Sequence, residues 1–176
     1  LPKLFAGKEN QSRHPSYVLA PQFPTRSSDY LMDSTLQVLS SAARPCLQTL
    51  LALVDSLKNN LNIDQQRIYV VGYSMGGSTV INALIARPEL FAAGISIAGI
   101  PQFAHADQLR NTPLWLIHGL TDLENHISSD NKLYAVLNKY HKIRFWKFEE
   151  RAHHDLFCKQ LLGTTLPEWL YRQHKN

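Results

Sequence analysis

One serine in the sequence lies in a setting that could make it a nucleophile. Residues 72–77 read Gly-Tyr-Ser-Met-Gly-Gly and place Ser74 between an apolar, β-branched run and an apolar helical pattern. A serine at the tip of such a strand-to-helix turn is held in a strained backbone conformation. We expect Gly72 and Gly76 to allow the close approach of the chain on either side, where a Cβ would clash. The turn would also aim the first helical amides, including that of Met75, at an oxyanion forming on a substrate carbonyl.

Such a serine needs a base to accept its proton and an acid to orient the base. In chains with this serine turn, the acid and then the histidine follow further along the sequence. Asp122 comes just after the apolar run at residues 114–117, and the carboxyl end of a parallel strand is where the serine turn would also lie. We predict Asp122 as the acid. Glu124 is the runner-up, and Asp130 is a weaker candidate because it falls in a predicted helix.

The base is expected to come from the adjacent pair His153 and His154, which follows the predicted strand at residues 143–148. Only one of the two side chains can face Ser74, and spacing alone leaves the choice open. His118 precedes a glycine at a strand end, so we expect it to support the loop that carries the acid. The remaining histidines are predicted to lie in loops, at helix ends or in the tail: His14, His105, His126, His141 and His174.

Strands and helices alternate along the chain. Apolar runs predict strands at residues 17–20, 67–72, 92–97, 114–117 and 143–148. Helical patterns predict helices at residues 75–86, 128–140 and 166–172, and an amphipathic helix that starts at Pro45. Residues 23–44 are rich in polar and turn-forming types and indicate a long loop with one short helix. This alternation predicts a single α/β domain over residues 1–176, with a mostly parallel sheet and helices on both of its faces.

Composition excludes several functional classes. The 176 residues are 44% hydrophobic and 18% charged, which is typical of a globular protein and not of a disordered one. No apolar run approaches the roughly 18 residues that a membrane-spanning helix needs. The net charge of +4 is scattered along the sequence, which argues against a nucleic-acid partner. No His, Asp and Glu spacing fits a metal site and no glycine-rich phosphate loop is present, so we predict neither a metal nor a cofactor.

The two cysteines leave the compartment open. Cys46 and Cys158 lie far apart in the sequence and could form one bridge, but two reduced, buried thiols are the favoured interpretation. We favour the cytoplasm over a secreted or periplasmic location, and the oligomeric state stays open. The chain begins at Leu1 without a signal-peptide pattern, which suggests processing or a segment of a longer protein.

Four segments carry a resemblance to a known family. They are residues 17–24 (YVLAPQFP), 63–77 (I-D-x-x-R-I-Y leading into G-x-S-M-G-G), 91–99 (FAAGISIAG) and 112–122 (T-P-x-W…H-G-x-x-D). Together they resemble the predicted-peptidase and poly(3-hydroxybutyrate)-depolymerase-like branch of the α/β-hydrolase esterases. The resemblance implies an α/β-hydrolase fold. Members of this branch carry an upstream loop that supplies a second oxyanion donor, and residues 1–10 look like the helix just after it, so the N-terminal strands of the fold would be lacking here.

The resemblance also implies which histidine is the base. The histidine loop of the family reads approximately G-H-D/N-x-W, and aligning Asp155 and Phe157 with this pattern puts the base at His154. His153 then stands where the family has glycine, and Phe157 replaces the tryptophan.

The function implied is that of a serine hydrolase that cleaves carboxylic esters, small or oligomeric, through an acyl-enzyme intermediate. Ser74, Asp122 and His154 would form the catalytic set. We expect an apolar substrate pocket with contributions from Tyr73, Phe103 and Phe157. The alternatives are a non-catalytic binding scaffold of the same fold, and a depolymerase or peptidase.

Overall fold

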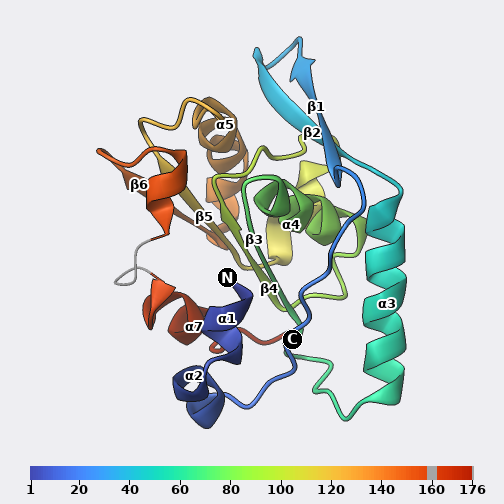
Figure 1. The fold of residues 1–176 in the computed structure, drawn as a ribbon. Helices are drawn as coiled ribbons and strands as arrows, with labels where there is room; N and C mark the ends of the chain where they lie inside the picture. Colours follow the sequence, from blue (N-terminus) through green and yellow to red (C-terminus); the bar gives the residue numbers. More distant parts are fainter. Residues whose placement is uncertain (158–161, 176) are drawn as a thin grey trace.

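The computed structural model describes residues 1–157 and 162–175, and at its centre is a four-stranded parallel sheet (Figure 1). Its strands, in spatial order, are β3 (Tyr69–Tyr73), β4 (Ala93–Ile97), β5 (Leu114–Gly119) and β6 (Ile143–Phe148). All neighbouring pairs are parallel, so the carboxyl ends of the four strands meet at one edge. Every residue of β4 and β5 is buried, which explains why continuous apolar runs predicted these central strands.

Helices cover both faces of the sheet. One face packs against α3 (Cys46–Asn60), α4 (Met75–Ala86) and α5 (Ser128–Leu137), and the other against α1 (Pro2–Ala6) and α7 (Thr165–Leu170). Side chains of β5 alternate between these two cores: Leu114 and Leu116 belong to the first, Trp115 and Ile117 to the second. The short elements are α2 (Lys8–Arg13), η1 (Ala106–Asn111), η2 (Asn138–Tyr140) and η3 (His153–Leu156). The predicted sheet with helices on both faces is confirmed.

The three tryptophans of the chain gather in one cluster on the face covered by α1 and α7. The ring of Trp115 on β5 lies edge-on to that of Trp146 on β6, with centroids 4.6 Å apart, and to that of Trp169 on α7, at 5.2 Å. Trp115 is fully buried. Edge-to-face aromatic pairs contribute about 0.5–1.5 kcal/mol beyond the free energy of burying their surface area. This cluster therefore stabilises the packing of α7 against the sheet.

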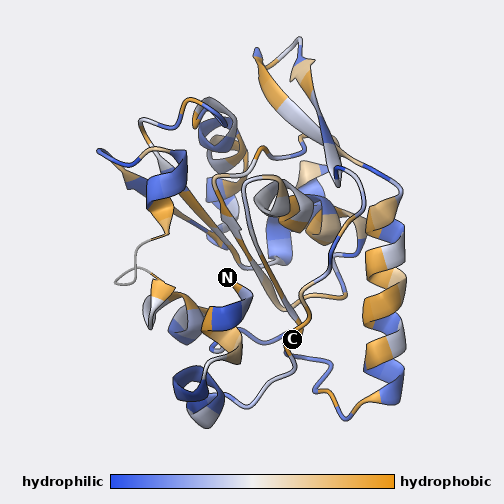
Figure 2. Ribbon diagram, in the orientation of Figure 1, coloured by the Kyte–Doolittle hydropathy of each residue, from blue (hydrophilic) through white to orange (hydrophobic). Residues whose placement is uncertain are grey.

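The long loop predicted at residues 23–44 is wrong in its larger part. It contains an antiparallel hairpin of β1 (Ser28–Asp33) and β2 (Val38–Ala43), which projects from the body of the molecule (Figure 1). The Asp33 carboxylate caps the turn by accepting hydrogen bonds from the amides of Thr35 and Leu36. Gln37, at the end of the turn, has a left-handed φ of 55°. Serines make up much of the inner face of the hairpin and bind α4 through hydroxyl groups, so hydrophobic patterning could not reveal these strands. On β1 the apolar side chains of Leu31 and Met32 are exposed, whereas Val38 on β2 is buried; Figure 2 shows how apolar and polar residues are mixed along the hairpin.

The strand predicted at residues 17–20 is also wrong. The segment is unpaired coil and its side chains are exposed, with Tyr17 at 65% and Leu19 at 43%. An apolar, β-branched run forms a strand only where a partner strand pairs with it. Within the described residues, the sheet order places only β4 beside β3, and no strand lies next to residues 17–20.

Cys46 is half-buried at the first position of α3. Cys158 lies outside the described residues, so its pairing with Cys46 stays an open prediction. Among the helices that the structure describes, none combines the length and the apolarity needed to cross a bilayer.

Candidate active site

Ser74 joins β3 to α4 with a backbone φ of 55° and ψ of −122°, a combination that residues other than glycine rarely adopt. Gly72 makes the turn possible, because a Cβ at this position would stand 2.1 Å from the carbonyl oxygen of Gly76. The amide of Ser74 donates to the carbonyl of Ile97 on β4, at 2.8 Å. The strained strand-to-helix turn expected from the sequence is therefore present, and it is fastened to the neighbouring strand.

The prediction that Gly76 is also crowded is wrong. Apart from its chain neighbours and the adjacent backbone of its own helix, a Cβ on Gly76 would meet no atom of the described residues within 4 Å. The crowded glycine of the first helical turn is Gly77, where a Cβ would stand 2.9 Å from the carbonyl oxygen of Ile97 and 2.9 Å from the hydroxyl of Ser96. Gly76 contributes to the turn through its carbonyl group, which fills the space left by Gly72.

The amide of Met75 lies directly beside Ser74. Helix α4 begins at Met75, and the first amides of a helix have no acceptor within that helix. The amide of Met75 can therefore donate a hydrogen bond to an atom held against Ser74, and the dipole of α4 favours negative charge at that point.

His153 links Ser74 to Asp122. Its Nε2 lies 2.9 Å from the hydroxyl oxygen of Ser74, and its Nδ1 lies 2.6 Å from Oδ2 of Asp122. Both partners are buried, with His153 at 4% and Asp122 at 1% exposed. An ionised carboxylate only accepts hydrogen bonds, so the proton of the neutral imidazole sits on Nδ1 and Nε2 is left to accept from the serine. This arrangement can move a proton from Ser74 to His153.

Asp122, and not the runner-up Glu124, is the carboxylate against Nδ1 of His153. Oδ1 of Asp122 accepts from the amides of Glu124 and Asn125, at 3.0 and 2.9 Å, which turns Oδ2 toward the histidine. Glu124 lies on the other side of the ring, where its Oε2 is 3.8 Å from Nε2 of His153. The third candidate, Asp130, is fully buried on α5.

The position predicted for His154 is wrong. Residues 153–156 form the 3₁₀ turn η3, and with three residues per turn the side chains of successive residues point in different directions. His153 therefore faces Ser74 while the side chain of His154 is 79% exposed. Nδ1 of His154 lies 3.2 Å from the hydroxyl of Tyr73, and its Nε2 lies 3.0 Å from Oε1 of Glu124.

A signal for the right histidine exists in the sequence. The family pattern has a glycine just before the base, and Ala152 is the small residue of this loop. Aligning Ala152 with that glycine makes His153 the base, whereas the alignment on Asp155 and Phe157 shifts it by one residue.

Gly119, at the end of β5, brings the two loops of the site together. A Cβ on Gly119 would stand 1.8 Å from the carbonyl oxygen of Arg151. Arg151 is two residues before His153, and Gly119 is three residues before Asp122. The absence of a side chain at this point therefore lets the loop after β6 cross the end of β5, where His153 reaches Asp122. From the sequence alone, this glycine is expected only to mark the end of a strand.

Of the three aromatic residues predicted to line a substrate pocket, Tyr73 lies beside His153 and Phe157 packs against Tyr73. The ring centroid of Tyr73 is 4.2 Å from that of Phe157 and 5.0 Å from that of His153. Burial raises the pKa of the Tyr73 phenol, and two nearby carboxylates raise it further. Phe157 is 41% exposed and so presents an open apolar surface. Phe103 instead packs against the core cluster on the α4 face.

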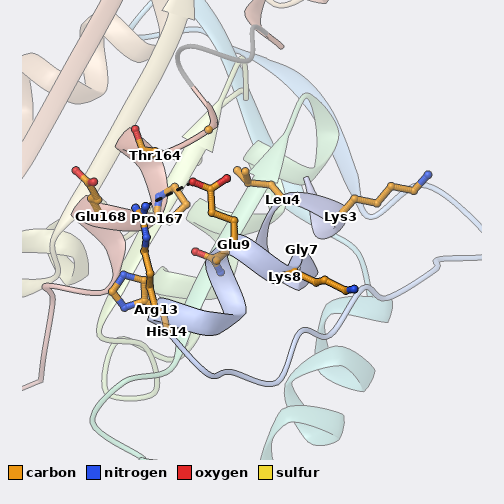
Figure 3. Close-up of a pocket in the computed structure, with 12 residues that line it drawn as sticks. Lys3, Leu4, Gly7, Lys8, Glu9, Arg13, His14, Thr164, Pro167 and Glu168 are labelled. Carbon is orange, nitrogen blue, oxygen red and sulfur yellow. Dashed lines mark ion pairs between the residues drawn. The ribbon is translucent and has the colours of Figure 1, made fainter.

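A separate cavity of about 220 Å³ lies between the N-terminal helices α1 and α2 and helix α7 (Figure 3). Basic and acidic side chains both line it, and an exposed ion pair joins Arg13 to Glu9 at 3.6 Å. Its lining includes none of the residues around Ser74, so it is a different feature from the candidate active site. Over residues 1–157 and 162–175, no three His, Cys, Asp or Glu side chains gather into a metal site.

Comparisons with known proteins agree with this architecture. Residues 41–107, which include Ser74 but neither Asp122 nor His153, match the profile of the prolyl oligopeptidase family. The crystal structure of a thermostable esterase superposes with a TM-score of 0.83 and 27% sequence identity, over 98% of this chain and 48% of that one. The chain belongs to the α/β-hydrolase superfamily. The resemblance to the serine esterases of this superfamily, drawn from the sequence motifs, is confirmed.

Two further proteins are similar to this α/β-hydrolase. The bifunctional acetylxylan esterase/xylanase XynS20E of Neocallimastix patriciarum is 31% identical over 70 residues, which are 40% of this chain and 10% of that protein. The acylaminoacyl peptidase of Pyrococcus horikoshii superposes with a TM-score of 0.59 at 21% identity, over 72% of this chain and 27% of that one. This similarity supports a shared fold and nothing more. The α/β-hydrolase described here spans about half the length of the thermostable esterase.

Proposed function

We propose that this α/β-hydrolase is a serine hydrolase that cleaves carboxylic esters through an acyl-enzyme intermediate. The observation that carries the proposal is the unbroken hydrogen-bond chain from Ser74 through His153 to Asp122. The structural similarity to a thermostable esterase and the sequence similarity to an acetylxylan esterase support the choice of an ester as substrate.

In the acylation step, Nε2 of His153 accepts the proton of the Ser74 hydroxyl while Oγ attacks the ester carbonyl carbon. Asp122 binds the Nδ1–H of His153 and stabilises the imidazolium that forms. The carbonyl oxygen becomes an oxyanion, and the Met75 amide donates a hydrogen bond to it. His153 then returns the proton to the departing alkoxide, which leaves as the alcohol. The acyl group remains on Ser74.

In the deacylation step, a water molecule takes the place of the alcohol. Nε2 of His153 accepts a proton from this water, whose oxygen attacks the acyl carbon. The bond to Oγ of Ser74 then breaks, and His153 returns the proton to the serine. The acid product leaves and the starting state is restored. Phe157 and Tyr73 provide an apolar surface beside the acyl carbon.

A peptidase is the second candidate, because residues 41–107 match the prolyl oligopeptidase family. The matched stretch carries the serine turn that esterases and peptidases share, so it does not distinguish an ester from an amide substrate. A binding scaffold is a weaker candidate. Such a protein has no need of the strained backbone at Ser74, which costs about 1–3 kcal/mol, or of a buried His153–Asp122 pair aimed at that serine.

A fluorophosphonate probe tests the proposal directly, because it forms a covalent adduct only with an activated serine. We expect intact mass spectrometry to show one adduct per chain on the wild-type protein and none on Ser74→Ala. Turnover of p-nitrophenyl acetate should then exceed that of the matched acetyl p-nitroanilide. A folded wild-type protein that forms no adduct would favour the binding scaffold, and faster cleavage of the anilide would favour the peptidase.

Glu124 is expected to disfavour esters whose alcohol group carries a negative charge. Its carboxylate lies 3.8 Å from Nε2 of His153, the atom from which the leaving alcohol receives its proton. Glu124 is 58% exposed, so water and salt weaken the repulsion, and we expect an effect of about three- to fivefold. Glu124→Gln should raise kcat/KM for 4-acetoxybenzoate by that factor relative to the neutral phenyl acetate, at low ionic strength.

The matched control is Glu150→Gln, which removes an exposed carboxylate from the loop after β6. It should leave the ratio of the two kcat/KM values unchanged. If Glu124→Gln also leaves this ratio unchanged, Glu124 has no part in the choice of substrate.

A further inference from the structure

A second histidine–carboxylate pair lies beside Asp122. His118 is on β5 and Asp130 is on α5. Both side chains are fully buried, and Nδ1 of His118 lies 2.7 Å from Oδ2 of Asp130. The proton transfers proposed above involve neither residue, so this buried polar pair needs another explanation.

The contacts of His118 fix the protons of the pair. Nε2 of His118 lies 2.6 Å from the carbonyl oxygen of Asn125, and a carbonyl only accepts, so Nε2 carries a proton. The contact between Nδ1 and the Asp130 carboxyl needs a proton of its own, since two acceptors repel one another at this distance. The pair therefore holds one proton more than a neutral imidazole beside a carboxylate. It is either an imidazolium with a carboxylate or an imidazole with a carboxylic acid.

The electrostatic environment agrees with this assignment. Burial alone would lower the pKa of His118, but the hydrogen bond and the charge of Asp130 raise it above its usual value. Burial raises the pKa of Asp130. Oδ1 of Asp130 has no hydrogen-bond partner among the described residues, so His118 is the group that binds this carboxyl.

The pair reaches Asp122 in two ways. Nε2 of His118 lies 3.2 Å from Oδ2 of Asp122, the same oxygen that binds His153 at 2.6 Å. His118 also binds the carbonyl of Asn125, whose amide in turn donates to Oδ1 of Asp122 at 2.9 Å. The side chain of Asn125 is fastened to the carbonyl of Ala98, at 2.6 Å. Among the described residues, the polar contacts of the Asp122 carboxylate other than that with His153 thus come from His118 and from the amides of Glu124 and Asn125.

We propose that the buried His118–Asp130 pair is a positioning device for the acid of the site. His118 holds the Asn125 carbonyl, and its Nε2–H stands beside Asp122, so that the carboxylate stays turned toward His153. The inference rests on the proposed function, in which Asp122 orients the base. His118 and Asp130 are positioning residues, because they touch neither Ser74 nor a substrate bound there.

Proton NMR of the folded protein provides a test that does not depend on turnover. The Nδ1–H of His153, bound to Asp122, should give a far-downfield signal that is absent from His153→Ala. We expect His118→Leu to shift or remove this signal. Leu116→Ala is the matched control, because it removes buried volume from the same strand and changes neither residue of the pair, and it should leave the signal in place.

Kinetics provide the second measurement, with circular dichroism used to choose a temperature at which all variants are folded. We expect His118→Leu to lower kcat by about ten- to a hundredfold, as small misplacements of catalytic groups do, with KM within about twofold of the wild type. The rate of fluorophosphonate labelling should fall in proportion. His118→Gln keeps an amide donor for the Asn125 carbonyl and should recover most of the lost kcat.

The outcomes separate this inference from the proposed function. A wild-type protein that neither turns over esters nor labels at Ser74 contradicts the proposed function, while the NMR signal still reports on the positioning. A folded His118→Leu protein with the wild-type signal and the wild-type labelling rate overturns the inference. Equal losses in His118→Leu, His118→Gln and Leu116→Ala would also overturn it, because they would reflect general destabilisation.

Discussion

We expect His153→Ala to lower kcat for a p-nitrophenyl ester by about 10⁵- to 10⁶-fold, and His154→Ala to retain at least about a third of it. Without His153 no group accepts the proton of Ser74, and loss of the base of a serine triad costs about as much as loss of the whole triad. His154 points into solvent and contacts Tyr73 and Glu124, so its removal leaves the bonds to Ser74 and Asp122 intact.

The comparison is well controlled because the two substitutions are chemically identical and adjacent in sequence. Initial rates of ester hydrolysis and the rate constant of fluorophosphonate labelling should give the same ranking. The circular dichroism spectra of both variants should match that of the wild type, since η3 is a four-residue turn after β6 and contributes little secondary structure. The reverse ranking, with His154→Ala inactive and His153→Ala active, would mean that the loop turns differently in the working enzyme.

The second large effect is expected at the serine turn. Gly72→Ala should destabilise the protein by about 3 kcal/mol or more, because the new Cβ would stand 2.1 Å from the Gly76 carbonyl oxygen and 2.8 Å from the Gly77 nitrogen. Both neighbours are backbone atoms and cannot rotate away as a side chain would. For a domain of this size, that loss lowers Tm by about 6–12 °C. Thermal unfolding followed by circular dichroism measures it, and labelling of Ser74 should be lost in parallel.

Gly76→Ala is the matched control for this effect. Its Cβ would meet no described atom within 4 Å, and alanine is a better helix former than glycine by up to about 1 kcal/mol. We therefore expect Tm to stay unchanged or to rise slightly. Equal losses of stability in the two variants would show that the crowding at Gly72 is not what selects glycine in this turn.

The sequence predicted the parallel sheet well because its central strands are buried on both faces. The runs that form β4 and β5 are almost wholly apolar, and such runs favour strands that are buried on both faces. The hairpin of β1 and β2 was missed because hydroxyl groups, and not apolar side chains, join it to α4. Residues 17–20 have the composition of a strand, but strand formation depends on a partner that local sequence does not reveal.

The sequence predicted which loops carry the candidate site, but it was less reliable about which residue in each loop takes part. Ser74 is fixed by its glycine-rich turn, and Asp122 by its place after β5. The choice between His153 and His154 depends on the direction of a short 3₁₀ turn, which changes by a third of a revolution with each residue. The contact between Gly119 and the Arg151 carbonyl joins residues that are 32 positions apart, and nothing in the local pattern marks such an approach.

Because the tryptophans form one cluster, the intrinsic fluorescence of the protein reports on a single region of the fold. The Trp115 ring contacts those of Trp146 and Trp169 where α7 meets β5 and β6, so intrinsic fluorescence reports on the packing of α7 against the sheet. Ser74 lies at the carboxyl edge of the sheet and is silent in this signal. During denaturation, fluorescence therefore reports on the contact between α7 and the sheet, whereas covalent labelling reports on the serine turn. Coincident midpoints would mean that the sheet and the serine turn melt as a single cooperative unit, and separate midpoints would show which of the two gives way first.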